Sequence, residues 1–197
     1  MTDPAAFFSD LDAALGQAWQ LLEQGAIDRR CPAHTPTLAS VGLGGEPQLR
    51  TVVLRACDRD SQTLLIHSDH RSPKFAELQR DPRCALHLYD PGQKMQLRVQ
   101  ARASLHTDDA IAERDWSAAQ RMSRLVYGVR QAPGSVIADP AAAVDGLNQA
   151  SEAEQRRSFA VIRLQIESLE WLYLAAAGHR RARFRLGRHP QADWLVP

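Results

Sequence analysis

The sequence is poor in cysteine, has no long apolar run and has no excess of charge of either sign. Its three cysteines, Cys31, Cys57 and Cys84, form no C-x-x-C pair, so neither a disulfide framework nor a zinc knuckle is expected. The longest apolar run, Trp171 to Ala177, is far shorter than a membrane span. The chain opens without the basic and apolar regions of a secretion signal, so we expect a cytoplasmic protein with no membrane partner.

Several functional motifs are also absent. The sequence contains no G-x-x-x-x-G-K-[ST], H-E-x-x-H or G-x-S-x-G pattern. The glycines of 42–45 lead into Pro47 and a β-rich run, which indicates a hairpin turn rather than a dinucleotide loop. His67, His70 and His87 lack carboxylate or cysteine partners at metal-ligand spacing, so no metal site is expected.

The overall composition is that of one globular domain. The 197 residues are 44% hydrophobic and 24% charged, which excludes a disordered chain. With 24 Lys and Arg against 23 Asp and Glu, the formal net charge is +1, which disfavours a generally basic nucleic-acid binder. Any basic site must therefore be local.

Residue patterns predict a helix at the N-terminus, further helices in the middle of the chain, and strands between them and toward the C-terminus. Apolar residues at three- and four-residue steps predict an N-terminal helix with Asp3 as its cap and Gly25 at its end. Ser72 and Thr107 are predicted to cap two further helices. The predicted helices cover 3–24, 73–80, 107–124 and 141–157, and the predicted strands cover 37–43, 48–57, 62–68, 84–89, 95–106, 159–166 and 180–186.

These elements predict an α+β protein with a mainly antiparallel sheet. Three strands follow one another without crossover helices, which favours a six-stranded antiparallel β-barrel with peripheral helices over a doubly wound sheet. We expect a single domain over 1–197, made of an N-terminal helix (1–25), a barrel core (37–106), a helical segment (107–157) and C-terminal strands (159–197).

The stretch from Arg50 to Lys74 carries the clearest functional signal. Arg50 and Arg55 bracket an apolar run on a predicted strand. A polar segment then leads to Ser72-Pro73-Lys74, where the free N–H groups and dipole of a helix N-terminus favour an anion. Arginine, lysine and hydroxyl groups that converge at such a place would bind a phosphate.

The order of these residues resembles the pyridoxamine 5'-phosphate oxidase family. The resemblance covers the chain from about Thr37 to its C-terminus. It is carried by Arg50-Thr51-Val52-Val53-Leu54-Arg55, Ile66-His67-Ser68-Asp69-His70-Arg71-Ser72-Pro73-Lys74, Asp81-Pro82, Tyr89-Asp90-Pro91, Gln96-Leu97-Arg98-Val99, Leu169-Glu170-Trp171, His179-Arg180-Arg181-Ala182-Arg183-Phe184 and Trp194-Leu195-Val196-Pro197.

The resemblance implies a split β-barrel homodimer with FMN in a cleft between subunits. Arg50 and Lys74 would meet the flavin phosphate, and Arg183 would approach the flavin from the second subunit. Gln96 would reach the ring, and Gln131 matches a flavin-contacting glutamine. The full set of implied cofactor-binding residues is Arg50, Thr51, Val52, Val53, Leu54, Arg55, His67, Ser68, Arg71, Ser72, Lys74, Gln96, Gln131 and Arg183.

The sequence also departs from the family at three places. Pro73 stands where the oxidases commonly have a basic residue, with Arg71 two positions earlier. Arg55 matches a lysine that holds the substrate phosphate. Gly178-His179-Arg180-Arg181 stands where the family has an Arg-x-His substrate signature.

We therefore predict an FMN-dependent oxidoreductase that oxidises a small phosphorylated or otherwise anionic amine or alcohol. No catalytic residue can be named, because the flavin itself would carry the redox step. One alternative is a non-catalytic flavin carrier or sensor of the same fold. Another is nucleic-acid binding through Arg180 to Arg188, although no aromatic residue interleaves with these arginines and no nucleic-acid partner is expected.

Overall fold

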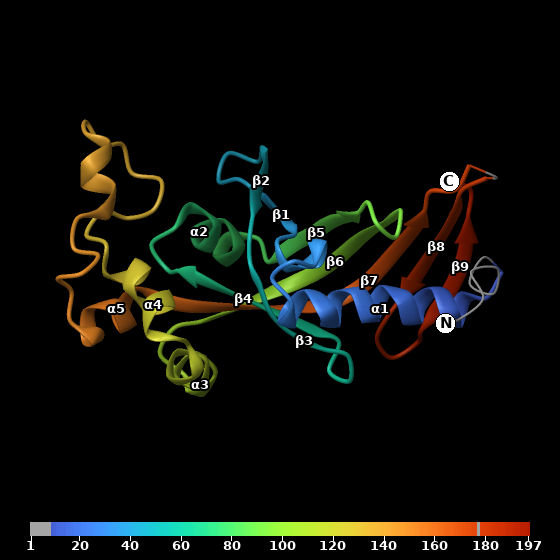
Figure 1. Ribbon diagram of the computed structural model, residues 1–197, viewed down its shortest axis with the longest axis horizontal. Coiled ribbons are helices and arrows are strands. Elements are labelled where there is room, and N and C mark those ends of the chain that lie inside the picture. Colours follow the sequence, from blue (N-terminus) through green and yellow to red (C-terminus); the bar gives the residue numbers. More distant parts are fainter. Residues whose placement is uncertain (1–8, 177) are drawn as a thin grey trace.

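A computed structural model describes residues 9–176 and 178–197 (Figure 1). Its α-helices are α1 (Leu11–Ile27), α2 (Pro73–Arg80), α3 (Ala110–Ala118), α4 (Arg121–Arg124) and α5 (Glu152–Ser158), and its 3-10 helices are η2 (Pro32–His34), η3 (Leu125–Gly128) and η4 (Pro140–Val144). Its strands are β1 (Thr37–Val41), β2 (Pro47–Thr51), β3 (Leu54–Asp58), β4 (Thr63–Asp69), β5 (Arg83–Asp90), β6 (Met95–His106), β7 (Phe159–Tyr173), β8 (Arg180–Arg185) and β9 (Gln191–Leu195). Within the described ranges, no helix is long and apolar enough to cross a membrane.

The strands form one antiparallel sheet in the order β2-β1-β5-β6-β7-β4-β3, with β8 and β9 added beside β7. The long strand β7 pairs with three other strands of this sheet. Strand β6 pairs with one edge of β7 along almost its whole length. On the other edge, β4 pairs with residues 159–165 and β8 pairs with residues 168–173. Two different strands therefore share one edge of β7 in succession.

The two ends of the strand order, β2 and β3, are joined by Val52 and Val53 alone. The N–H group of Val52 donates to the carbonyl of Pro36 at 3.0 Å, and the side chains of Val52 and Leu54 are buried in the core. The predicted single strand over 48–57 is thus two strands. The α+β antiparallel fold is confirmed, but the described strands number nine rather than six and no hydrogen-bonded ladder closes them into a barrel.

Helix α1 packs against β3 and η2 through an apolar face that includes Ala14, Ala18 and Leu22, all fully buried. Asp10 caps its N-terminus, whereas the predicted cap Asp3 lies outside the described residues. The helix continues through Gly25 to Ile27, so the prediction that Gly25 ends it is wrong. Gly25 is instead the point of close approach to η2.

Several other boundaries differ from those predicted. Asp109, not Thr107, caps α3, because its carboxylate accepts from two N–H groups of the first turn. The stretch 107–124 contains two helices. Of the predicted helix 141–157 only 152–157 is α-helical, as part of α5, which a capping box at Ser151 starts. Strand β7 extends to Tyr173, seven residues beyond its predicted end, and β9 was not predicted.

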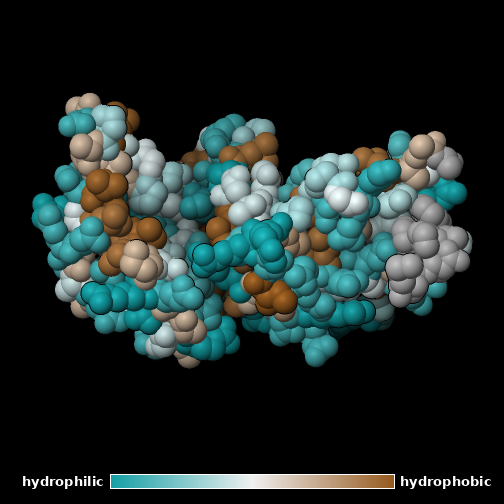
Figure 2. Space-filling view, viewed as in Figure 1, coloured by the Kyte–Doolittle hydropathy of each residue, from teal (hydrophilic) through white to brown (hydrophobic). Residues whose placement is uncertain are grey.

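The segment between α4 and α5 exposes apolar side chains. Figure 2 shows a mostly hydrophilic face with large brown areas over this end of the molecule. Val126, Val136 and Val144 are more than half exposed there. An apolar surface of this kind is typical of a contact region.

We predict opposite effects of alanine at the two glycines of α1. A Cβ at Gly25 would lie 2.6 Å from the backbone of Ala33, so Gly25→Ala should lower the free energy of unfolding by about 1–3 kcal/mol. Among the described residues, no atom outside the adjoining turns of α1 lies within 4 Å of a Cβ at Gly16, so Gly16→Ala should raise it by about 0.5–1 kcal/mol. Urea denaturation measures both. Equal effects of the two changes would show that helix propensity, not the contact with η2, governs Gly25.

Candidate functional site

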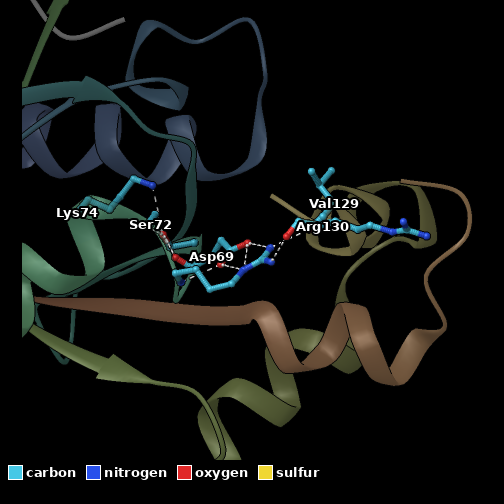
Figure 3. A network of polar contacts seen from close by, with 7 residues as sticks. Asp69, Ser72, Lys74, Val129 and Arg130 are labelled. Atoms are coloured by element: carbon cyan, nitrogen blue, oxygen red, sulfur yellow. Dashed lines mark hydrogen bonds and ion pairs between the residues drawn. The ribbon is translucent and has the colours of Figure 1, made fainter. Parts of the chain in front are cut away.

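The turn from β4 into α2 gathers polar side chains at one corner (Figure 3). The hydroxyl groups of Ser68 and Ser72 lie 3.2 Å apart, and both residues are almost fully buried. The ammonium of Lys74 donates to the Ser68 hydroxyl at 3.3 Å. Ser72 occupies the N-cap position of α2, but its side chain does not cap the helix as predicted, because it contacts Ser68 instead. The first turn of α2 thus has no side-chain cap.

Arg50 from β2 reaches the same corner, where a buried carboxylate already neutralises it. Its Nη2 lies 2.7 Å from Oε2 of Glu77, which is 5% exposed, and its Nη1 donates to the Ser40 hydroxyl. Burial, and then the charge of Arg50, lower the pKa of Lys74 against the smaller opposite effects of the Asp69 and Glu77 carboxylates. Among the described residues no carboxylate forms an ion pair with Lys74. The corner therefore holds a half-buried cation that an added anion would stabilise.

Arg55 and His67 face a different groove. Together with Arg29 and Asp115 they line a space of about 240 Å³ beside α3. Nε2 of His67 lies 3.4 Å from Oδ2 of Asp115, and its ring meets Phe159 edge-on at 4.9 Å. Burial and the charge of Arg55 lower the pKa of His67 despite the carboxylate of Asp115.

Arg71 sits between the corner and a neighbouring loop. Its guanidinium binds both carboxylate oxygens of Asp69 and donates to the carbonyls of Val129 and Arg130. The next residue in that loop is Gln131, which is exposed. Arg71 thus contacts the segment that leads to another predicted site residue.

The apolar residues of the predicted set lie at the join between β2 and β3. The side chains of Val52 and Leu54 belong to the core, and Val53 is half-buried. Thr51 is exposed. The side chains of these two core residues are therefore not available to a ligand.

Gln96 and Arg183 lie at the other end of β7. Ser68 pairs with Ala160 of β7, whereas Arg183 pairs with Glu170, ten positions further on and about 33 Å away along an extended strand. Gln96 pairs with Leu172, so its side chain is on the same face as Arg183. The predicted site residues therefore lie toward two separate ends of β7, with the corner and the groove of Arg55 and His67 toward one end and Gln96 and Arg183 toward the other. Figure 1 shows this separation as the distance between α2 and β8.

Arg183 faces a groove of about 440 Å³ that Arg98, Glu170 and Arg185 also line. Its Nη2 lies 3.6 Å from Oδ2 of Asp193, and its buried Nε has no hydrogen-bond partner among the described residues. Glu170 binds Arg98 and Arg181, and Asp193 binds Arg185. The arginine face of β8 is thus partly neutralised, unlike an open basic surface for nucleic acid.

The chain is similar to proteins of a known family. The profile of the pyridoxamine 5'-phosphate oxidase family matches residues 32–170. The chain belongs to this family. A pyridoxine/pyridoxamine 5'-phosphate oxidase 2 from Arabidopsis thaliana is 33% identical over 127 residues, which are 59% of this chain and 64% of that protein. The chain thus spans slightly less than two thirds of that relative's length.

Two solved structures share the fold. A pyridoxamine 5'-phosphate oxidase-related, FMN binding protein from Nostoc punctiforme has a TM-score of 0.75 at 21% identity, over 92% of this chain and 96% of the other. PhzG from Burkholderia lata, in complex with tetrahydrophenazine-1-carboxylic acid, has a TM-score of 0.74 at 18% identity, over 100% of this chain and 98% of the other. The fold is that of the oxidase family.

Three partners of the predicted site residues were missed by sequence reasoning. Glu77 neutralises Arg50, Asp69 holds Arg71, and Asp115 contacts His67. Asp69 is only two residues from Arg71, so the sequence alone could have indicated this ion pair. Glu77 and Asp115 are distant in sequence from their partners and gave none.

We predict that Lys74→Met stabilises the ligand-free protein. The change removes a half-buried cation beside Arg50, so it should raise the Tm by about 2–4 °C, the shift that about 1 kcal/mol produces in a domain of this size. Lys94, the only other lysine, is exposed, and Lys94→Met is the matched control. Differential scanning calorimetry measures both. A lower Tm for Lys74→Met would show that its contact with Ser68 outweighs its burial.

We predict that the stability of the protein falls as the pH is lowered through about 6.5, partly because of His67. Its pKa is lowered from 6.5 in the folded state, so below 6.5 the unfolded chain binds more protons and is favoured. His67→Gln should reduce the slope of unfolding free energy against pH between 6.5 and 5. The same change at the exposed His189 is the control. An unchanged slope in His67→Gln would assign the acid sensitivity to other groups.

Proposed function

We propose that this protein binds FMN between two copies of the chain and uses it to oxidise a small phosphorylated or otherwise anionic amine or alcohol. The observation that carries the proposal is the cation at the β4–α2 corner. Lys74 is half-buried, lies near a second cation and lacks a carboxylate partner among the described residues. Family membership supports FMN as the anion that completes this corner.

The corner fits the phosphate of FMN in charge and in donors. Lys74 supplies a positive charge, Ser68 and Ser72 supply hydroxyl groups, and the uncapped first turn of α2 adds backbone N–H groups. A phosphate bound there would offset the repulsion between Lys74 and Arg50. Glu77 remains paired with Arg50, so Lys74 is the cation left for the phosphate.

The two separate groups of site residues support a cofactor position between two copies. Within one chain the corner and Arg183 are too far apart along β7 to contact one FMN molecule. A second copy can bring its own Gln96 and Arg183 to the first copy's corner. The exposed Val126, Val136 and Val144 suit a contact between copies.

A bound flavin supplies the two-electron redox chemistry. The chain's own residues bind and orient the reactants. The guanidinium of Arg183 would supply positive charge to a reduced flavin, and Gln96, on the same face of the sheet, would offer a hydrogen bond. Arg55 and Arg29 line the groove next to His67 and would hold the anionic group of the substrate.

The proposed substrate class is based on the groove that Arg29, Arg55 and His67 line and on the relatives of the chain. The Arabidopsis relative is named for phosphorylated pyridoxine and pyridoxamine. In this chain Gly178-His179-Arg180-Arg181 replaces the family's Arg-x-His, and Arg181 is bound to Glu170. Pyridoxamine 5'-phosphate is therefore the first substrate to test, within a wider class of anionic amines and alcohols.

We predict that the purified protein carries stoichiometric FMN, visible in its absorption spectrum. Lys74→Met should weaken FMN binding about tenfold to a hundredfold, because a charge-assisted contact contributes about 1.5–3 kcal/mol. Calorimetric titration of the FMN-free protein measures the affinity, with Lys94→Met as the control. Unchanged affinity in Lys74→Met would place the phosphate elsewhere.

Turnover separates an oxidase from a carrier of flavin. Oxygen uptake by the FMN-loaded protein is measured with pyridoxamine 5'-phosphate, pyridoxine 5'-phosphate and their unphosphorylated forms. Uptake that depends on the phosphate group and falls in Arg55→Ala supports the proposed substrate site. Stoichiometric FMN with no reduction by any anionic amine or alcohol would support the non-catalytic alternative.

A further inference from the structure

Residues 128–135, here called the cover segment, lie across the β4–α2 turn and contact it at two points. At the first point Arg71 donates to the carbonyls of Val129 at 3.0 Å and Arg130 at 3.2 Å. Figure 3 shows these contacts running from Asp69 toward Val129 and Arg130. At the second point Gly134 packs so closely on the turn that a Cβ there would lie 3.1 Å from Cγ of Pro73.

Arg71 is itself fixed by a buried carboxylate. Its Nε lies 2.9 Å from Oδ1 of Asp69, and its Nη2 lies 2.6 Å from Oδ2. The backbone N–H of Arg71 also donates to Oδ1 of Asp69 at 2.8 Å, and Asp69 is 8% exposed. A planar guanidinium held on both oxygens of a carboxylate has a fixed direction.

The hydrogen bonds of Arg71 within the protein use most of the N–H groups that could bind a ligand. A guanidinium has five N–H groups. The Nε–H and one N–H of Nη2 serve Asp69, the other N–H of Nη2 serves Val129, and one N–H of Nη1 serves Arg130. One N–H of Nη1 remains. Arg71 is thus a poor candidate for a bidentate phosphate ligand.

We propose that Arg71 is a positioning residue that fixes the cover segment over the β4–α2 corner and so sets the place of Gln131. Gln131 lies between the two contact points, after Arg130 and before Gly134. The same arrangement accounts for Pro73, where the oxidases commonly have a basic residue. Pro73 supports the cover segment through Gly134, whose φ of +86° favours glycine. The effect of Arg71 on FMN binding rests on the proposed function. The attachment of the cover segment by Arg71 does not depend on it.

Hydrogen exchange of the FMN-free protein tests the attachment. The amide of Arg130 donates to the carbonyl of Asp145, and the amide of Ser135 donates to that of Ala132, so both amides report on the cover segment. Arg71→Ala should speed their exchange about tenfold or more. Arg157→Ala is the matched control, because Arg157 is an exposed arginine that lines one groove together with Arg71 and Val129. Unchanged exchange in Arg71→Ala would overturn the proposal.

A double-mutant cycle on FMN affinity tests whether Arg71 acts through Gln131. We expect Arg71→Ala to weaken FMN binding about tenfold in the natural chain and less than about twofold in the Gln131→Ala background. The visible spectrum of bound FMN should shift alike in both single variants. An equal loss of affinity in both backgrounds would show that Arg71 contacts the phosphate directly and would overturn the proposal.

The two experiments separate this proposal from the proposed function. If the natural chain binds no FMN, the proposed function fails, and hydrogen exchange still decides whether Arg71 holds the cover segment. If FMN binds and Arg71→Ala changes neither exchange nor affinity, only the positioning role fails.

Discussion

The arrangement of the whole molecule depends on how the edge of β7 is shared. A strand edge can pair with one partner at each position, so β4 and β8 occupy successive stretches of the same edge. This pairing holds the β4–α2 corner and the face of β8 at opposite ends of one strand. The proposed cofactor position between two copies follows from this constraint, because one chain cannot bring both ends to one ligand.

The balance of charge at the corner is the second constraint. Glu77 is buried with Arg50 and neutralises it, which leaves Lys74 as the cation without a carboxylate partner in the described part of the chain. A half-buried cation of this kind costs stability in the free protein, and proteins accept such a cost where a ligand supplies the missing charge. Asp69 neutralises a second cation in this region. It forms an ion pair with Arg71 and directs its guanidinium toward the backbone carbonyl of Val129.

The sequence predicted the order of helices and strands better than the residues at which they begin and end. Alternating and helical patterns located eight of the strands and the main helices, because these patterns follow from which face is buried. The break at Val52 and Val53 was invisible, since both residues are good strand formers and the chain changes its pairing partner there from β1 to β4, which depends on long-range contacts. The resemblance to the oxidase family pointed to the residues of the corner. It did not place Gln96 on the same face of the sheet as Arg183, because that arrangement comes from strand register rather than from sequence distance.

The central place of β7 also determines when this chain can fold during synthesis. Without β7 the strand order separates into β2-β1-β5-β6 on one side and β4-β3 on the other. Those strands leave the ribosome before residues 159–173, so a nascent chain that lacks β7 exposes the unpaired edges of β6 and β4. The assembly of the core therefore waits for the last fifth of the polypeptide, and a chain that terminates before β7 has two unconnected sheets and open strand edges that recruit chaperones or aggregate.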